Sequence, residues 1–350
     1  MKRLEEEIKD FLLERGAIKV AFTNNAALKG GPPSADLTYA LPEARSAVSF
    51  ALPLDREKIR LCLSKKTHKE FEENNLETNI RVNKIGKELA LWLESLGFPS
   101  KRIIANNKYR KDCEGWQLKM HPDISHRYVA VASGLGTFGW SGNVLVEGWG
   151  AAVILGTVVT RAELEPTYPI PPEKSLCFMC KLCVGACPSG MFDKKEKTSV
   201  TLGGRTYTFA KRISYTRCQL VCGGFSGLAR SGKWSTWSPG RYRFHEIADE
   251  DDLVRELVRA IGNYSKWPRR SDGDGGYKNE AVEGLNIRLT CGNCQLICWG
   301  NEKDNQENYR ILTTSGCVVQ KENGEIVVLP PDEAEKLFVN LPPEHRKLYM

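Results

Sequence analysis

The stretch CFMCKLCVGACPSG, residues 177–190, places four cysteines at spacings of two, two and three residues and ends them with a proline. These are Cys177, Cys180, Cys183 and Cys187, with Pro188 directly behind. The spacing is typical of thiolate ligands to iron–sulfur clusters, and in proteins with two clusters the fourth cysteine of such a run serves a different cluster from the first three. Further ligands must therefore come from elsewhere in the chain.

Two more cysteine groups follow downstream. The segment CGNCQLIC has spacings of two and three residues, and RCQLVC lies between the two larger groups. Four cysteines, three cysteines and one of the middle pair make the eight that two [4Fe–4S] clusters require. Crossed ligation predicts one cluster on Cys177, Cys180, Cys183 and Cys298. It predicts the other on Cys187, Cys291, Cys294 and either Cys218 or Cys222.

Paired structural zinc sites are the alternative, because they also use C-x2-C pairs. The third cysteine after another two residues and the C-P dipeptide favour iron–sulfur clusters. The remaining cysteines, Cys62, Cys113 and Cys317, have no marked partner in the sequence. We expect them, and the unused member of the middle pair, to be small buried hydrophobic residues.

Composition places limits on the kind of protein. With 350 residues, two domains are the default, and 41% hydrophobic and 27% charged residues are ordinary for a globular chain. No apolar run is long enough for a membrane span, and the N-terminus MKRLEEEIKD reads as an amphipathic helix. Twelve cysteines then indicate metal or redox chemistry in the cytoplasm. The net charge of +7 is compatible with RNA or an acidic partner and does not decide between them.

Periodicity predicts an α+β fold. Strands are expected at 17–22, 46–54, 103–105 and 151–160, and a helical stripe from Ile85 to Leu96 ends at Gly97. Residues 1–167 are therefore expected to form one domain of mixed helices and strands. After the proline-marked stretch 168–173, residues 168–350 form the second, with an insertion at 223–290 and a C-terminal extension. The aromatic residues of 232–244 in that insertion are expected to anchor it to the core.

The glycine run GLGTFG, residues 134–139, matches the G-x-G-x-x-G pattern of dinucleotide sites. That pattern binds a pyrophosphate only between a strand and the start of a helix. VAVAS before it could pass as a strand, but the sequence after it is glycine-broken and strand-like. Dinucleotide binding is therefore disfavoured.

The glycine run belongs to a longer block, RYVAVASGLGTFGWSGNVLVEGWGAAVILGTVVT at 127–160, followed by the two larger cysteine groups. The order of these blocks resembles the epoxyqueuosine reductases and the reductive dehalogenases. The resemblance implies a nitroreductase-like cobalamin-binding domain followed by a bacterial ferredoxin-like domain with two [4Fe–4S] clusters. It also implies that the corrin contacts the glycine segment, at Gly134, Leu135, Gly136, Gly139, Ser141, Gly142 and Asn143.

Departures from the family pattern bear on the substrate. Trp140 and Ser141 stand where the queuosine enzymes carry a lysine and an asparagine, and Met120 stands where they carry an aspartate. We therefore expect another substrate than epoxyqueuosine in tRNA. No D-x-H-x-x-G run is present to ligate cobalt, which fits cobalamin in its base-off form.

Reduction by a corrinoid usually needs a proton donor, and HPDISHRY at 121–128 precedes the glycine segment. His121, Asp123 and Tyr128 are the candidate catalytic residues. The competing interpretation of Asp123 is a helix cap for a helix that begins at Ile124.

Three hypotheses result. The first is a cobalamin-dependent reductase that acts on a small molecule or a corrinoid protein, with electrons from a low-potential donor such as ferredoxin or flavodoxin. The second is a non-catalytic electron carrier or activator of a corrinoid protein, and the third is a zinc-stabilised binding module. The N-terminal domain favours the first, since a carrier has little use for it. Transfer RNA is kept as an alternative partner, and no membrane contact is expected.

Overall fold

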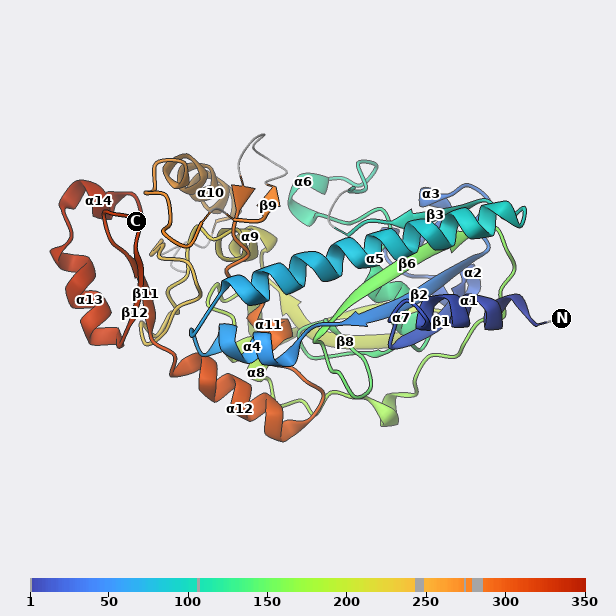
Figure 1. The fold of residues 1–350 in the computed structure, drawn as a ribbon. Helices are drawn as coiled ribbons and strands as arrows, with labels where there is room; N and C mark the ends of the chain where they lie inside the picture. Colours follow the sequence, from blue (N-terminus) through green and yellow to red (C-terminus); the bar gives the residue numbers. More distant parts are fainter. Residues whose placement is uncertain (1, 106–107, 243–248, 274, 279–285) are drawn as a thin grey trace.

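A computed structural model of the chain describes residues 2–105, 108–242, 249–273, 275–278 and 286–350. Helices and strands are mixed, as the α+β prediction requires (Figure 1). The main sheet has four strands in the order β1-β2-β6-β3, and every neighbouring pair is antiparallel. Its strands are β1 (Lys19–Asn24), β2 (Ser46–Pro53), β3 (Ser100–Ile103) and β6 (Val153–Thr160).

Strand β2 is buried on both faces, because alternate side chains of a strand point to opposite sides of the sheet. Val48, Phe50 and Leu52 enter a hydrophobic core on one side. Ala47 and Ala51 enter another core on the other side. The nearly continuous apolar sequence of this strand predicts this burial, and the prediction is confirmed.

Helices α1 (Leu4–Leu13) and α5 (Lys69–Ser95) cover the first face of the sheet (Figure 1). Phe11 of α1 stacks on Trp92 of α5 with ring centroids 5.6 Å apart. The predicted helical stripe is confirmed, and Gly97 follows the helix with φ at +89°, where a side chain would be strained.

Helix α7 (His126–Ala132) covers the other face. Residues 129–132, the apolar part of VAVAS, therefore belong to a helix, and the strand interpretation of that segment is wrong. The glycine run follows this helix and contains β4 (Thr137–Phe138), which pairs with β5 (Val144–Leu145). The arrangement is the reverse of the strand-to-helix turn that a dinucleotide site needs.

Short elements complete the N-terminal half. They are α2 (Asn25–Leu28), α3 (Leu37–Ala40), α4 (Arg56–Leu63), α6 (Trp116–Lys119) and the 3₁₀ turn Pro33–Ala35. The C-terminal half continues with a 3₁₀ turn at Pro172–Lys174, α8 (Leu182–Gly185), the hairpin β7 (Phe192–Leu202) and β8 (Arg205–Arg212), and α9 (Tyr215–Cys222). It ends with α10 (Glu250–Tyr264), β9 (Tyr277–Lys278), β10 (Asn286–Ile287), α11 (Asn293–Leu296), α12 (Glu302–Thr313), β11 (Cys317–Gln320), β12 (Ile326–Leu329), α13 (Pro331–Asn340) and α14 (Pro343–Lys347). In the part of the chain that the structure describes, no helix is long and apolar enough to cross a membrane.

The two halves share their cores. Val200, Leu202 and Phe209 of the β7-β8 hairpin belong to the same hydrophobic cluster as the residues of α7. The aromatic segment of the insertion also packs inward, and the Trp237 indole donates to the backbone oxygen of Cys62 at 2.9 Å. Its anchoring role is confirmed up to residue 242, and 243 and 244 lie outside the described residues. The division at 167/168 stays a prediction, and it does not coincide with a break in the packing.

A buried ion pair also joins the halves. Glu72, near the start of α5, accepts from Arg288 at 3.1 Å and from the backbone N–H of Leu289 at 3.2 Å. The two side chains are only 7% and 3% exposed. Burial makes both charges dependent on each other, since neither can be solvated by water.

Glu72→Ala should lower the free energy of unfolding by about 3 kcal/mol, because it leaves the buried Arg288 with fewer counter-charges. Chemical denaturation of the purified protein measures the difference. Glu73→Ala is the matched control, since Glu73 forms only an exposed pair with Lys69 and should change stability far less. Equal losses in the two variants would contradict the importance of the buried pair.

Candidate functional site

The loop that carries the first three cysteines has a strained backbone. Met179 and Lys181 have φ of +56° and +58°, the left-handed region that residues other than glycine rarely occupy. Such strain persists only where the surroundings require it, and it concentrates at functional sites. Here the two bends curl the loop so that all three of its cysteines border one cavity.

The fourth cysteine at that cavity is Cys298, more than a hundred residues later in the chain. Burial first, and then the neighbouring thiols, raise the pKa of Cys183 to about 11 and that of Cys298 to about 12. The Asn305 side-chain amide donates to the sulfur of Cys298 at 3.9 Å. The structure thus brings together the four cysteines that crossed ligation assigns to one cluster.

The second group gathers around α9 and α11. Cys218 and Cys222 have their sulfurs 3.4 Å apart, and Cys222 also interacts with Cys291. Burial and the neighbouring thiols, first Cys187 and then Cys218, raise the pKa of Cys294 strongly. Cys218 is an electrostatic neighbour of Cys187 and Cys294, and Cys222 contacts Cys291, so either can be the eighth ligand.

Both cysteine groups have the ligand chemistry that iron–sulfur clusters need, because each supplies several thiols and each has a side-chain amide N–H directed at a sulfur. In the second group Asn143 supplies that N–H, donating to Cys294 at 3.6 Å. Across the described residues, no three His, Cys, Asp or Glu side chains are arranged to hold a single metal ion. A four-iron cube keeps its thiolates further apart than a single ion would, so the looser grouping is compatible with a cluster.

A cavity of about 540 Å³ lies beside the second cysteine group, between α7, α9 and the loop that precedes α7. Cys218 and Cys222 form part of its wall. Of the predicted proton donors, His121 and Tyr128 line it. The cavity therefore adjoins both a cysteine group and groups that can carry protons.

Asp123 does not line the cavity. Its carboxylate is buried and accepts the backbone N–H of Ile124 at 2.8 Å. Helix α7 begins at His126 with Ser125 before it, so Asp123 is not its cap either. The cap interpretation is therefore wrong, while the catalytic role of Asp123 stays a prediction.

Burial shapes the protonation of the cavity wall. It lowers the pKa of His126 to about 4, and together with Lys119 and Arg110 it lowers that of His121. The Nδ1 atom of His126 lies 2.8 Å from the Thr157 hydroxyl, and its buried Nε2 has no partner among the described residues. Burial raises the pKa of Tyr128, so this phenol keeps its proton at neutral pH.

Tyr215 is a cavity residue that the sequence analysis missed. Burial alone would raise the pKa of its phenol, but Arg212 and then Arg127 outweigh burial and lower it. The signal in the sequence was its position three residues before Cys218, which on a helix places both side chains on one face.

The glycine run contacts protein rather than open space. A Cβ at Gly134 would collide with the backbone oxygen of Tyr168, and one at Gly136 would lie 2.3 Å from the backbone oxygen of Leu145. Of the seven predicted corrin contacts, Asn143 lines the large cavity, while Gly139 and Ser141 line the cavity of the first cysteine group. Packing within the protein thus accounts for the glycines at 134 and 136.

No family model matches the chain, and no curated protein matches it. Solved structures do match. An epoxyqueuosine reductase with an epoxyqueuosine-modified tRNA-Tyr stem loop is 20% identical, with a TM-score of 0.36, over 54% of this chain and 52% of that one. An epoxyqueuosine reductase from Streptococcus thermophilus is 15% identical, with a TM-score of 0.36, over 58% and 56%. A catabolic reductive dehalogenase in complex with 3-bromo-4-hydroxybenzoic acid is 15% identical, with a TM-score of 0.46, over 73% and 36%.

These structures are of reductases, and they come from the two families that the sequence motifs resemble. The chain spans about half the length of the epoxyqueuosine reductases and about a third of the length of the dehalogenase. None of the three TM-scores reaches 0.5, so nothing about the activity of this chain follows from them.

Cys298→Ala should destroy the cluster held by the 177–183 loop and leave the other intact, because its sulfur borders only the first cavity. Iron analysis and electron paramagnetic resonance of the dithionite-reduced, anaerobically purified protein measure the loss of one signal. Cys113→Ala is the control, since Cys113 belongs to neither group and should leave both signals unchanged. Loss of the other cluster alone would contradict the crossed ligation.

Proposed function

We propose that this chain is an iron–sulfur reductase with two [4Fe–4S] clusters and a base-off cobalamin, and that it reduces a small organic substrate. The observation that carries the proposal is the position of the large cavity, whose wall includes Cys218 and Cys222 of the second cysteine group. Electrons stored at that group would need to cross only the cavity wall to reach a bound molecule.

The cavity has the size of a ligand site. Its volume of about 540 Å³ lies within the roughly 300–1,000 Å³ of ordinary small-molecule pockets. When bound, cobalamin supplies a redox-active cobalt that the side chains of the protein do not provide. Asn143 is the predicted contact that would hold it from the cluster side. The cavity, and not the glycine run, is what supports this cofactor.

Tyr215 is the proton donor that we favour. It lines the cavity between the arginines and the cysteine wall, and Arg212 donates to its oxygen at 3.5 Å. The arginines stabilise its phenolate, so it gives up a proton more readily than Tyr128, whose pKa is raised. Tyr128 and His121 stay as secondary candidates.

Electrons would enter at the first cysteine group, which reaches the surface. Cys180 is exposed, and so are its neighbours Phe178, at 55%, and Met179, at 50%. Lys181 and Lys197 lie against the nearby Trp140 ring and give this surface positive charge. An acidic low-potential electron donor such as ferredoxin or flavodoxin would bind to this positively charged surface. Added salt should then slow the reduction of the clusters by ferredoxin, and a rate that does not depend on salt would contradict this docking site.

Epoxyqueuosine in tRNA is the alternative substrate, and weak turnover of it is expected. Met120, at the position of the family aspartate, lines the cavity with a thioether that donates no proton. Efficient conversion of epoxyqueuosine tRNA by the purified protein would overturn this expectation, but it would not contradict the proposed clusters and cobalamin. A cytoplasmic location likewise stays a prediction from the cysteine content.

The proposal is tested by metal analysis and cobalamin binding. Anaerobically purified protein should contain about eight iron atoms per chain and absorb broadly at roughly 400 nm until dithionite bleaches it. It should also bind cobalamin, and electron paramagnetic resonance of the cob(II)alamin form should show no nitrogen splitting from an axial ligand. Stoichiometric zinc without iron would support the zinc module, and clusters without cobalamin binding would support the electron carrier.

Tyr215 should ionise below the ordinary tyrosine pKa of about 10, because two arginines stabilise its phenolate. Nuclear magnetic resonance of protein labelled at the tyrosine Cζ measures this, and Tyr215→Phe should remove the early-titrating signal. Tyr128→Phe is the control and should remove a signal that titrates above 10. An ionisation of Tyr215 above that of Tyr128 would contradict its assignment as the stronger acid.

A further inference from the structure

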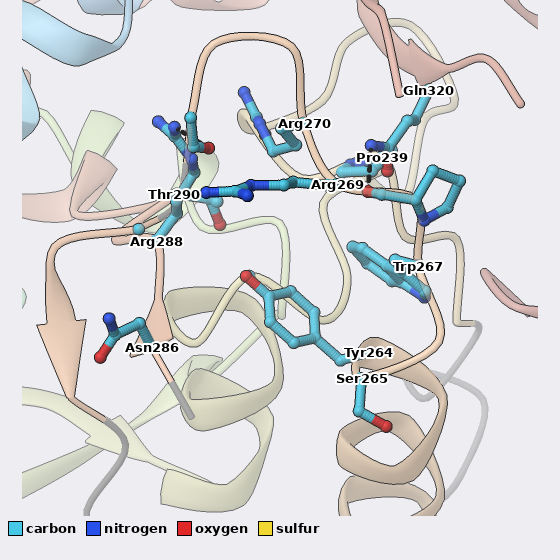
Figure 2. Close-up of a pocket in the computed structure, with 14 residues that line it drawn as sticks. Pro239, Tyr264, Ser265, Trp267, Arg269, Arg270, Asn286, Arg288, Thr290 and Gln320 are labelled. Carbon is cyan, nitrogen blue, oxygen red and sulfur yellow. Dashed lines mark hydrogen bonds between the residues drawn. The ribbon is translucent and has the colours of Figure 1, made fainter. Parts of the chain in front are cut away.

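Among the described residues, two cavities are each lined by more than one arginine, and they differ in how those charges are balanced. The cavity in the insertion lies between Tyr264, Trp267 and three arginines (Figure 2). There Arg270 pairs with Asp272 at 2.9 Å, and Arg288 pairs with Glu72 at 3.1 Å and with Asp272 at 3.4 Å. The charges of these two arginines are thus met within the protein.

The large cavity has no such balance. Arg127 and Arg212 both line it, and neither forms an ion pair with a carboxylate among the described residues. Arg127 donates to the backbone oxygen of Gly142 at 2.9 Å, and Arg212 donates to that of the adjacent Ser141 at 2.9 Å. The two guanidinium groups are therefore held side by side by neutral acceptors.

Further observations show that this pair is under-compensated. Burial first, and then the charge of Arg212, lower the pKa of Arg127. The buried Nε of Arg212 has no hydrogen-bond partner among the described residues. The described lining also includes Lys119 and contains no aspartate or glutamate. Buried like charges are costly unless a counter-charge meets them.

The cysteine group can balance only one of the two arginines. Arg212 is an electrostatic neighbour of Cys218 and Cys294, so its charge would face a cluster bound there. The principal electrostatic neighbours of Arg127 are instead Arg212, Tyr215 and Tyr128. An anion from outside the protein is the missing counter-charge for Arg127.

We propose that the large cavity binds a small organic oxyanion, a carboxylate or a phosphate ester, with the anionic group between Arg127 and Arg212. This inference rests on the proposed function and names the class of its substrate. Planar guanidinium groups match the oxygens of both kinds of anion. Tyr128 and Tyr215 would flank the organic part, which favours a ring.

The test measures binding to the anaerobically purified protein with its clusters and cobalamin bound, by isothermal titration calorimetry. The probes are benzoate, phenyl phosphate and the neutral benzamide. At least one anionic probe should bind tenfold or more tightly than benzamide, since a charge-assisted hydrogen bond is lost with the neutral probe. Equal affinity for all three probes, or no binding of any, would overturn the inference.

Substitution of the arginines locates the site. Arg127→Gln and Arg212→Gln should each weaken binding of the anionic probe tenfold or more. Arg270→Gln, in the cavity of Figure 2, is the matched control and should leave the affinity unchanged. Equal loss in all three variants would overturn the assignment, because it would reflect general charge and not this pair.

Thermal unfolding separates binding from folding. Without an added anion, Arg127→Gln should unfold at the same or a higher temperature than the unchanged protein, since it removes an unbalanced buried charge. Phenyl phosphate should raise the unfolding temperature of the unchanged protein and not that of the variant. A variant that is destabilised without ligand would overturn the inference and make Arg127 a structural residue.

Other sources of the anion give distinct results. If the arginines hold the phosphate of cobalamin, both variants will lose cobalamin affinity, and the cobalamin-loaded protein will bind no probe. If they hold the backbone of an RNA, a tRNA stem loop will compete with the probe. Either result overturns the small-molecule class. Protein without iron or cobalamin would instead refute the proposed function, which the metal analysis detects separately.

Discussion

Cysteines from three distant parts of the chain meet in two small volumes, and this meeting is a constraint on the packing around them. Cys298 borders the same cavity as the cysteines of the 177–183 loop, and the segments of α8 and α11 lie together, with the Asn293 amide donating to the backbone oxygen of Ala186 at 3.3 Å. The same constraint reaches the main sheet. Just before β6, a Cβ at Gly150 would lie 2.3 Å from the backbone carbon of Trp299, and Ala151 donates to the backbone oxygen of Cys298 at 2.7 Å.

Much of the fold could be predicted, because local patterns carry it. The buried strand β2 and the stripe of α5 have clear periods, and the cysteine spacings indicated which thiols meet. VAVAS was ambiguous because a short apolar run suits a buried strand or a buried helix equally well. Arg127 and Arg212 are 85 residues apart, and only the tertiary fold brings them together. Asp123 was a candidate by position, but the direction of its side chain is not visible in a sequence.

The electrostatics of the large cavity explain why two tyrosines there differ. Tyr128 and Tyr215 are both largely buried, and burial raises the pKa of each phenol. Only for Tyr215 do the arginines outweigh burial, and Arg212 also donates to its oxygen. Arg127 and Arg212, the arginines of the proposed anion site, therefore also make the phenol of Tyr215 more acidic. Charge that is unbalanced within the described residues would then serve both the proposed binding and the proposed proton transfer.

The shared cores have a consequence for how the molecule is made. Val200, Leu202 and Phe209 complete a cluster that begins with residues near the N-terminus, so the first half emerges from the ribosome with part of its apolar surface uncovered. Cys298 is the last of the cluster cysteines to be synthesised. If it completes the first cluster, iron delivery must wait until nearly 300 residues have been translated. Assembly of that cluster would then come late in synthesis rather than proceed domain by domain.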